Sequence, residues 1–102
     1  MKDKDLYSGF IRLHILYHAS KGTIFGLGLI EELGRHGYRI SPGTLYPILH
    51  SLENRGYLRS AGEQIGGRIR RVYKITYEGR RALNAAKDKV RELFGELFED
   101  GS

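Results

Sequence analysis

The chain has 102 residues, a formal net charge of +5 at pH 7 and no cysteine. The length fits one domain with a small core, and the lack of cysteine excludes a disulfide framework and thiolate metal sites. No stretch approaches the roughly 20 apolar residues of a membrane span, and no apolar run follows a basic start, so we expect neither membrane association nor a signal peptide. These features predict a cytoplasmic protein.

The first predicted helix covers residues 6–20. One apolar stripe along it consists of Leu6, Phe10, Leu13 and Tyr17. Ile11 and Ile15 lie on another face, with Leu16 between the two. A helix that is apolar on more than one side must be covered from more than one direction. In so small a chain, we expect a partner subunit to supply part of that cover.

The second predicted helix covers residues 24–35 and ends before Gly37. Its inward positions are Phe25, Leu29, Ile30 and Leu33. A short turn then leads to a third helix, which predicts a helix-turn-helix. Gly26 and Gly28 lack the third glycine and the preceding strand of a dinucleotide-binding motif, so we interpret them as small residues for close helix packing.

The third predicted helix, residues 42–55, is the most informative segment. Ser41 is placed to cap it, Pro42 suits its first position, and Gly56 ends it. Its buried stripe consists of Leu45, Ile48, Leu49 and Leu52. The opposite face is uncharged and small at its N-terminal end, with Gly43, Pro47, His50 and Asn54 flanked by Thr44, Tyr46 and Ser51. A solvated helix face usually carries Lys and Glu, whereas a face that lies against base edges can have this composition.

Residues 57–64 and 68–76 are predicted to form two strands of a hairpin around Ile65, Gly66 and Gly67. Three arginines, Arg68, Arg70 and Arg71, would stand at its tip. Positive charge is concentrated in this part of the chain, because residues 35–81 hold ten Lys and Arg against three Asp and Glu. A basic hairpin beside an uncharged helix face predicts a winged helix-turn-helix, which is an α+β fold that is mostly α.

Residues 77–99 are predicted to form a last helix capped by Thr76. Its apolar positions follow a 3-4-3-4 spacing through Leu83, Ala86, Val90, Leu93 and Leu97, widened near the end by Phe94 and Phe98. The helix is longer than a small winged helix can cover, so we predict homodimerisation. The expected organisation is a DNA-binding winged helix over residues 1–76 and a dimerisation helix over residues 77–100 that packs on helix 6–20 of the partner.

Other chemistry finds little support in the sequence. His14 and His18 share a helix face as a metal pair would, but no third ligand of matching spacing follows, so we expect no metal site. Ser41 or Ser51 with His50 has no activating carboxylate at a suggestive position. We therefore expect no enzymatic activity and no cofactor.

Several segments together resemble the PadR-type transcriptional regulators. They are Phe25 to Leu33 (FGLGLIEEL), Ser41 to Leu49 (SPGTLYPIL), Leu52 to Leu58 (LENRGYL), Gly66 to Tyr73 (GGRIRRVY) and Thr76 to Gly79 (TYEG). The resemblance runs from about residue 9 to residue 99. The SPGTLYP segment combined with an arginine-rich wing after two glycines is specific to this family.

The resemblance implies a dimeric repressor that binds an inverted-repeat operator in double-stranded DNA, and so associates with the nucleoid. The candidate DNA-binding residues are Ser41, Pro42, Gly43, Thr44, Tyr46, Pro47, His50, Arg68, Arg70, Arg71 and Tyr73. The candidate dimer-interface residues are Leu6, Phe10, Leu13, Tyr17, Leu83, Ala86, Val90, Leu93, Phe94 and Leu97.

The single short C-terminal helix is similar to that of the small subfamily, which lacks a larger effector-sensing domain. Some small members bind flat aromatic drugs between the subunits, stacked on tryptophan. This chain has no tryptophan, although Phe94 or Phe98 could line an interface pocket for a small-molecule effector. The alternative hypothesis is a winged-helix module that binds an acidic protein partner, which predicts weak DNA binding without sequence preference.

Overall fold

A computed structural model describes residues 3–99. Residues 1–2 of the predicted DNA-binding region 1–76 and residue 100 of the predicted dimerisation segment 77–100 lie outside the described residues. The elements are α1 (Lys4–Lys21), β1 (Ile24–Phe25), α2 (Gly26–Arg35), α3 (Pro42–Asn54), β2 (Leu58–Ile65), β3 (Arg68–Ile75), α4 (Tyr77–Phe94) and the π-helical turn η1 (Gly95–Glu99). The predicted α+β class, mostly α, is confirmed.

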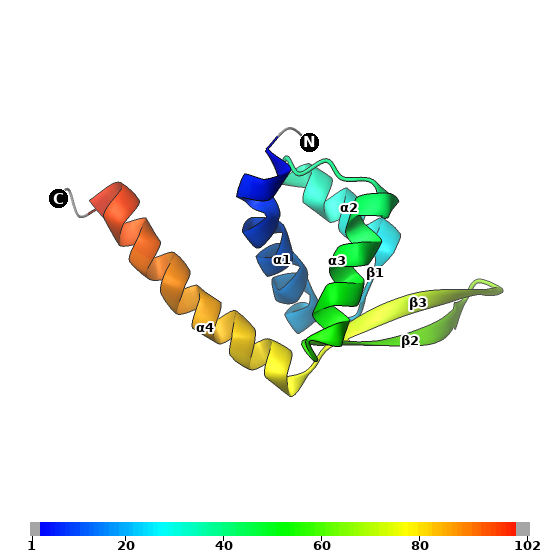
Figure 1. The fold of residues 1–102 in the computed structure, drawn as a ribbon. Coiled ribbons are helices and arrows are strands. Elements are labelled where there is room, and N and C mark those ends of the chain that lie inside the picture. The colour runs from blue at the N-terminus through cyan, green and yellow to red at the C-terminus, as the bar shows by residue number, and fades with distance from the viewer. Residues whose placement is uncertain (1–2, 100–102) are drawn as a thin grey trace.

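The three N-terminal helices pack together, and two long elements extend from them in opposite directions. Figure 1 shows the β2–β3 hairpin projecting on one side while α4 runs away on the other. The described chain is accordingly elongated, with extents of 56 × 31 × 20 Å. The hairpin is the wing of a winged helix, and α4 is the predicted C-terminal helix.

The sheet has three antiparallel strands in the order β1-β3-β2. β1 pairs Ile24 with Tyr73 and Phe25 with Val72, so residues 24–25 form a strand instead of the start of a helix. Helix α2 therefore begins at Gly26, two residues later than predicted. A β-branched residue and an aromatic residue fit a pleated surface, and the edge of β3 offers them partners that helix periodicity cannot reveal.

The core lies between α1, the helix-turn-helix and the base of the sheet. Its largest fully buried side chains are Tyr73, Ile11, Ile15, Leu33, Leu45 and Leu49. Val72 and Tyr73 are consecutive in β3 and point to opposite faces of the sheet, yet both are buried. Both faces of this middle strand are therefore covered at this point.

Helices α2 and α3 end in the same way, each with a glycine in the left-handed region. Gly37 has φ +90° and Gly56 has φ +83°. In each case the next residue reaches back along the helix, with the Tyr38 N–H donating to the Leu33 carbonyl and the Tyr57 N–H to that of Leu52. These are Schellman motifs, which satisfy carbonyl groups that a helix end otherwise leaves unpaired.

Helix α4 starts where the sequence predicts. The Thr76 hydroxyl accepts a hydrogen bond from the Gly79 N–H at 3.0 Å. The predicted single helix over residues 77–99 is corrected at its far end, because the α-helical geometry stops at Phe94 and Gly95 opens the wider turn η1. Glycine is a weak helix former, which favours the change at this position. Within residues 3–99 no helix is both long enough and apolar enough to cross a membrane.

Candidate nucleic-acid interface

Ser41, Pro42 and Gly43 at the start of α3 are exposed, whereas Thr44 is half-buried. The Ser41 hydroxyl accepts a hydrogen bond from the Thr44 N–H at 3.3 Å, and Pro42 occupies the first turn, as predicted. Gly43 is exposed, and a Cβ added there would meet only the Ser41 hydroxyl oxygen, at 3.7 Å. Packing within the chain therefore does not require this glycine.

Pro47 and His50 are also exposed on α3. Because Pro47 has no N–H, the Gly43 carbonyl cannot receive the usual helical hydrogen bond one turn later. The outward face thus carries a free backbone acceptor and small or uncharged side chains, as its composition indicates.

Tyr46 is placed differently from the rest of that face. Its hydroxyl lies over the backbone of Gly26, so close that a Cβ added to Gly26 would be 2.3 Å from it. The Tyr46 side chain is 38% exposed, so one side of the ring is covered by α2 and the other is open. Gly26 is therefore needed for contact with one tyrosine, which refines the interpretation of it as a site of close helix packing.

A chain of contacts connects this tyrosine to the wing. Phe25, the neighbour of Gly26, lies under the guanidinium group of Arg70, which is 4.8 Å from the ring centroid. Arg70 is half-buried as a result. Residues from α3, the start of α2, β1 and β3 are thus in sequential contact from Tyr46 to Arg70. The inward position predicted for Phe25 is wrong, because strand β1 holds this ring beneath the wing.

The wing itself is a tight hairpin. Gly66 (φ +57°) and Gly67 (φ +80°) form a two-residue turn, and Ile65 pairs with Arg68, so Ile65 belongs to the strand and not to the turn as predicted. Positive φ at both turn residues matches the twist of the strands. Arg68 is exposed next to the turn.

The base of the wing is attached to the end of α3. The Glu53 carboxylate accepts hydrogen bonds from the Ser60 N–H (3.2 Å) and hydroxyl (2.6 Å), and Arg71 donates to the same hydroxyl oxygen at 2.9 Å. Arg71 is therefore exposed but held at the hairpin base. These bonds fix the wing relative to α3.

Ile69 is a wing residue that the sequence reasoning missed. Its side chain is 80% exposed between two arginines. The sequence offered one signal for it, which is the alternation of Arg68, Ile69 and Arg70 along the strand. Successive side chains of a strand point to opposite faces, so Ile69 is expected on the face opposite to the two arginines.

One predicted DNA-binding residue does not belong to this surface. Tyr73 is 0% exposed, because it lies in the central strand beneath the helices. Burial, with the nearby Glu53 carboxylate, also raises the pKa of its hydroxyl. We therefore remove Tyr73 from the candidate interface and assign it to the core.

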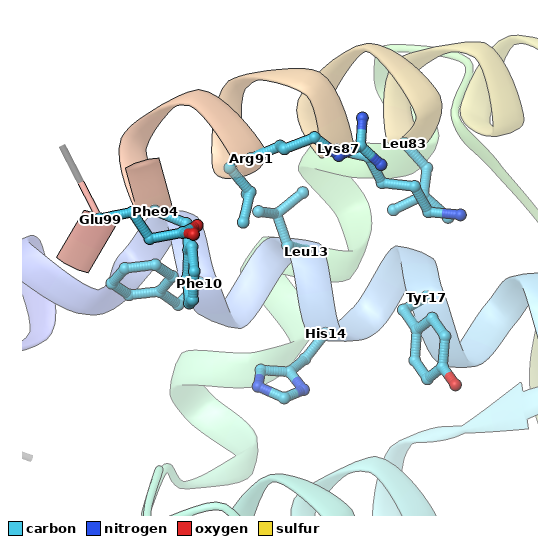
Figure 2. A pocket seen from close by; sticks show the side chains of 10 residues that line it. Phe10, Leu13, His14, Tyr17, Leu83, Lys87, Arg91, Phe94 and Glu99 are labelled. Atoms are coloured by element: carbon cyan, nitrogen blue, oxygen red, sulfur yellow. The ribbon is translucent and has the colours of Figure 1, made fainter. Parts of the chain in front are cut away.

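A second surface lies on α1 and α4, on the side of the molecule away from the wing. We call it the α1–α4 apolar face, and its exposed members are Leu6, Phe10, Tyr17, Val90, Leu93, Phe94, Leu97 and Phe98. Between the two helices is a groove of about 560 Å³. Figure 2 shows Phe10 and Leu13 of α1 facing Arg91 and Phe94 of α4 across it.

Not every predicted interface residue is available on that face. Leu83 is 6% exposed and belongs to the core of its own chain, because α4 is still close to α1 at this point. Leu13 and Ala86 are half-buried, and Leu13 packs against the core. Phe94 lines the groove within one chain, and Phe98 lies against Phe94 with ring centroids 5.0 Å apart.

The sequence shows no third ligand of matching spacing for His14 and His18, but the fold brings a third imidazole to them. His36, the C-cap of α2, brings a ring nitrogen to them, and one nitrogen from each of the three histidines lies within 4.8 Å of the others. Sequence spacing could not show this, because the contact joins two helices. Burial, followed by the proximity of His36 and His18, lowers the pKa of His14.

These features together define a winged helix-turn-helix protein with a candidate DNA-binding side and an apolar side. Residues 15–85 match the transcriptional regulator PadR-like family. The chain is 51% identical over 88 residues to transcriptional regulator Rv3488 of Mycobacterium tuberculosis, covering 86% of this chain and 82% of that protein. The chain belongs to the PadR-like family of transcriptional regulators.

Solved structures of the same family have the same fold. The crystal structure of a PadR family transcriptional regulator from Eggerthella lenta superimposes with a TM-score of 0.78 at 31% identity, over 93% of this chain and 87% of that one. A PadR-like transcriptional regulator from Bacillus cereus gives a TM-score of 0.80 at 25% identity, over 93% and 97% of the two chains.

Proposed function

We propose that the protein is a homodimeric repressor that binds an inverted-repeat operator in double-stranded DNA. Helix α3 enters the major groove, and the wing contacts the adjacent backbone or minor groove. Residues 1–76 bind DNA, and residues 77–100 hold two subunits together by packing on α1 of the partner. The protein acts in the cytoplasm at the nucleoid and carries out no catalysis.

The observation that carries this proposal is the contact chain from Tyr46 through Gly26 and Phe25 to Arg70. It fixes the exposed, uncharged start of α3 relative to an arginine-bearing wing. Arginine donates hydrogen bonds to phosphate oxygens and so orients a protein on the DNA duplex. Small uncharged side chains permit the helix to come close to the base edges. One rigid surface thus supplies both requirements of sequence-specific binding.

The proposal is tested first by selection from a pool of random DNA duplexes. We expect an enriched inverted repeat whose half-sites are centred about one helical turn, roughly 34–36 Å, apart. Fluorescence anisotropy should then give at least about 10³-fold tighter binding to the selected duplex than to a scrambled one. Failure to enrich any sequence, with weak and equal binding to both duplexes, would favour the acidic-partner alternative.

Two substitutions should separate sequence readout from phosphate binding. Thr44→Ala is expected to weaken operator binding by about 1–3 kcal/mol and to leave binding to scrambled DNA unchanged. The helix itself should be preserved, because the backbone N–H of residue 44 still donates to the Ser41 hydroxyl. Arg68→Ala should weaken binding to both duplexes and reduce the salt slope by about 1 for each arginine removed. Anisotropy at several salt concentrations measures both effects. Equal losses on both duplexes for Thr44→Ala would remove this residue from base readout.

Gly43 should tolerate a side chain in the fold but not in the complex. Gly43→Ala and Gly43→Leu are expected to leave the free energy of unfolding unchanged or to raise it by up to about 1 kcal/mol, because alanine and leucine are better helix formers than glycine. Gly43→Leu should nevertheless lower operator affinity at least about 100-fold, and Gly43→Ala much less, because the longer side chain projects from the DNA-facing surface. Thermal melts and anisotropy on the graded pair provide the measurement. Full operator affinity in Gly43→Leu would show that α3 does not lie in the groove.

A further inference from the structure

Three of the four histidines of the chain gather at one point on the helical side of the molecule. His14 and His18 are one turn apart on α1, and His36 stands at the end of α2. A ring nitrogen from each lies within 4.8 Å of the other two. The cluster lies outside the proposed DNA-binding surface and uses none of its residues. Figure 2 shows His14 projecting from α1 on the side away from α4.

The backbone around the cluster is fixed without any ligand. The Schellman motif at Gly37 sets the position of His36, since the Tyr38 N–H donates to the Leu33 carbonyl at 2.9 Å. The Tyr38 ring then stands edge-on to His14, with centroids 5.3 Å apart. The backbone that carries the three histidines is therefore pre-organised on two packed helix segments, and only the side chains need to reorient on binding.

One carboxylate, that of Glu32, lies beside the cluster, and its Oε1 is also paired with Nη1 of Arg35 at 2.6 Å. Glu32 is on α2 one turn before His36, with its Oε2 3.1 Å from Nε2 of His36 and 3.8 Å from Nε2 of His18. Carboxylates that hold histidine ligands by hydrogen bonds orient the rings and increase their basicity.

We propose that His14, His18 and His36 bind a divalent transition-metal ion of the zinc type. Neutral imidazole is the ligand that Zn²⁺ and its first-row neighbours accept in proteins, and three protein ligands leave one position open to water. Glu32 is the positioning residue, because it holds His36 by a hydrogen bond of 3.1 Å.

The imidazole rings must turn to bind the ion. His14 and His36 are stacked, with centroids 4.6 Å apart and an interplanar angle of 29°. Bonds of about 2.0–2.1 Å to a tetrahedral ion would place donor nitrogens about 3.3 Å apart, closer than the present limit of 4.8 Å. Rotation about the broad χ2 torsion of histidine brings the lone pairs together at small energetic cost.

The position of the site also predicts what the ion would influence. It would join α1, which carries Phe10 and Tyr17 of the α1–α4 apolar face, to the turn that leads into α3. Metal occupancy would therefore couple the subunit contact to the orientation of the recognition helix. This consequence rests on the proposed function, whereas the binding of the ion does not.

The test is metal binding by the full, tag-free chain after chelator treatment. We expect saturable uptake of one Zn²⁺ per chain by calorimetry, and visible d–d absorption bands when Co²⁺ replaces it. His36→Gln should lower the affinity for either ion at least about 100-fold, and Glu32→Gln should lower it about 10–100-fold. The matched control is His50→Gln, which removes the one histidine outside the cluster and should bind metal like the unmodified chain.

Circular dichroism of each variant establishes that the fold persists. Equal metal affinity in the unmodified chain, His36→Gln and His50→Gln would overturn the proposal, as would the absence of saturable binding. Operator binding in the presence of chelator keeps the two proposals separate. A chain that binds the selected operator but no metal contradicts only the metal site, and one that binds metal but no specific DNA contradicts only the proposed function.

Discussion

Replacing Gly79 with alanine is expected to lower the free energy of unfolding by more than about 3 kcal/mol, at the upper end of the usual cost of overpacking. A Cβ at this position would be 2.2 Å from the Tyr57 carbonyl oxygen and 2.7 Å from Cγ1 of Ile75. Both distances are shorter than any real contact, and the first partner is backbone, which cannot rotate out of the way. The first turn of α4 or the start of β2 must therefore move.

Movement at this point breaks a small set of shared hydrogen bonds. The Tyr57 carbonyl also accepts from the Thr76 N–H at 3.0 Å. The Thr76 hydroxyl donates to the Gly56 carbonyl while it accepts from the Gly79 N–H. Displacing Gly79 thus disturbs the helix cap, the end of the β2–β3 ladder and the turn after α3 together. These bonds fix the direction in which α4 leaves the winged helix.

The measurement is thermal and denaturant unfolding at a fixed protein concentration. A loss above about 3 kcal/mol corresponds to a fall in melting temperature of more than about 12 °C for a domain of this size. Gly34→Ala is the matched control, because nothing lies within 4 Å of a Cβ added there. It should be neutral or stabilise by up to about 1 kcal/mol. Similar stability in both variants would show that α4 is not held by this contact.

Features that depend on neighbouring residues in the chain were predictable from the sequence. Ser41 and Thr76 were expected as helix caps, and each hydroxyl accepts the hydrogen bond that capping requires. The buried stripe of α3 was also predicted correctly, because a period of 3.6 residues fixes which side chains share a face.

Features that depend on contacts between distant segments were not predictable in this way. Strand β1 has only two residues, and the edge of β3 determines its conformation. Tyr73 follows an arginine-rich stretch typical of an exposed wing, yet the central position of its strand buries it. Leu83 continues the spacing of the apolar seam, but it lies where α4 is still in contact with α1.

The histidine cluster shows the same limitation at a candidate site. The spacing of His14 and His18 revealed two possible ligands on one helix face, and the third came from the end of another helix. The packing of α2 on α1 brings these segments together, and a single sequence carries no direct signal for that packing. The sequence likewise gives no sign that Tyr46 and Gly26 are in contact, whereas in the fold the Tyr46 hydroxyl lies against the Gly26 backbone.

The second large effect is expected at the proposed subunit contact, where Leu93→Glu should abolish dimerisation. Leu93 is 42% exposed on α4, beyond the part of the helix that its own chain covers. Its apolar neighbours Val90 and Leu97 are 45% and 63% exposed. A contiguous apolar surface of this kind marks an association site, and a carboxylate at its centre would be buried without a partner.

The loss should extend to DNA, although Leu93 lies far from the recognition helix along the chain. Two linked half-site contacts bind more tightly than one by about 10²–10⁴-fold, because the second contact forms within an existing complex. We therefore expect Leu93→Glu to be monomeric by light scattering and at least about 100-fold weaker on the selected operator. Circular dichroism should show an intact fold, since Leu93 lies outside the buried core.

The matched control is Asn84→Glu, which adds the same charge to the same helix. Asn84 is exposed and, at about 100° per residue, lies on the opposite side of α4 from Leu93. This variant should remain dimeric and bind the operator normally. If instead both variants are dimeric, the α1–α4 apolar face is not the subunit contact. If Leu93→Glu is monomeric but retains full operator affinity, one subunit suffices for recognition and the inverted-repeat model fails.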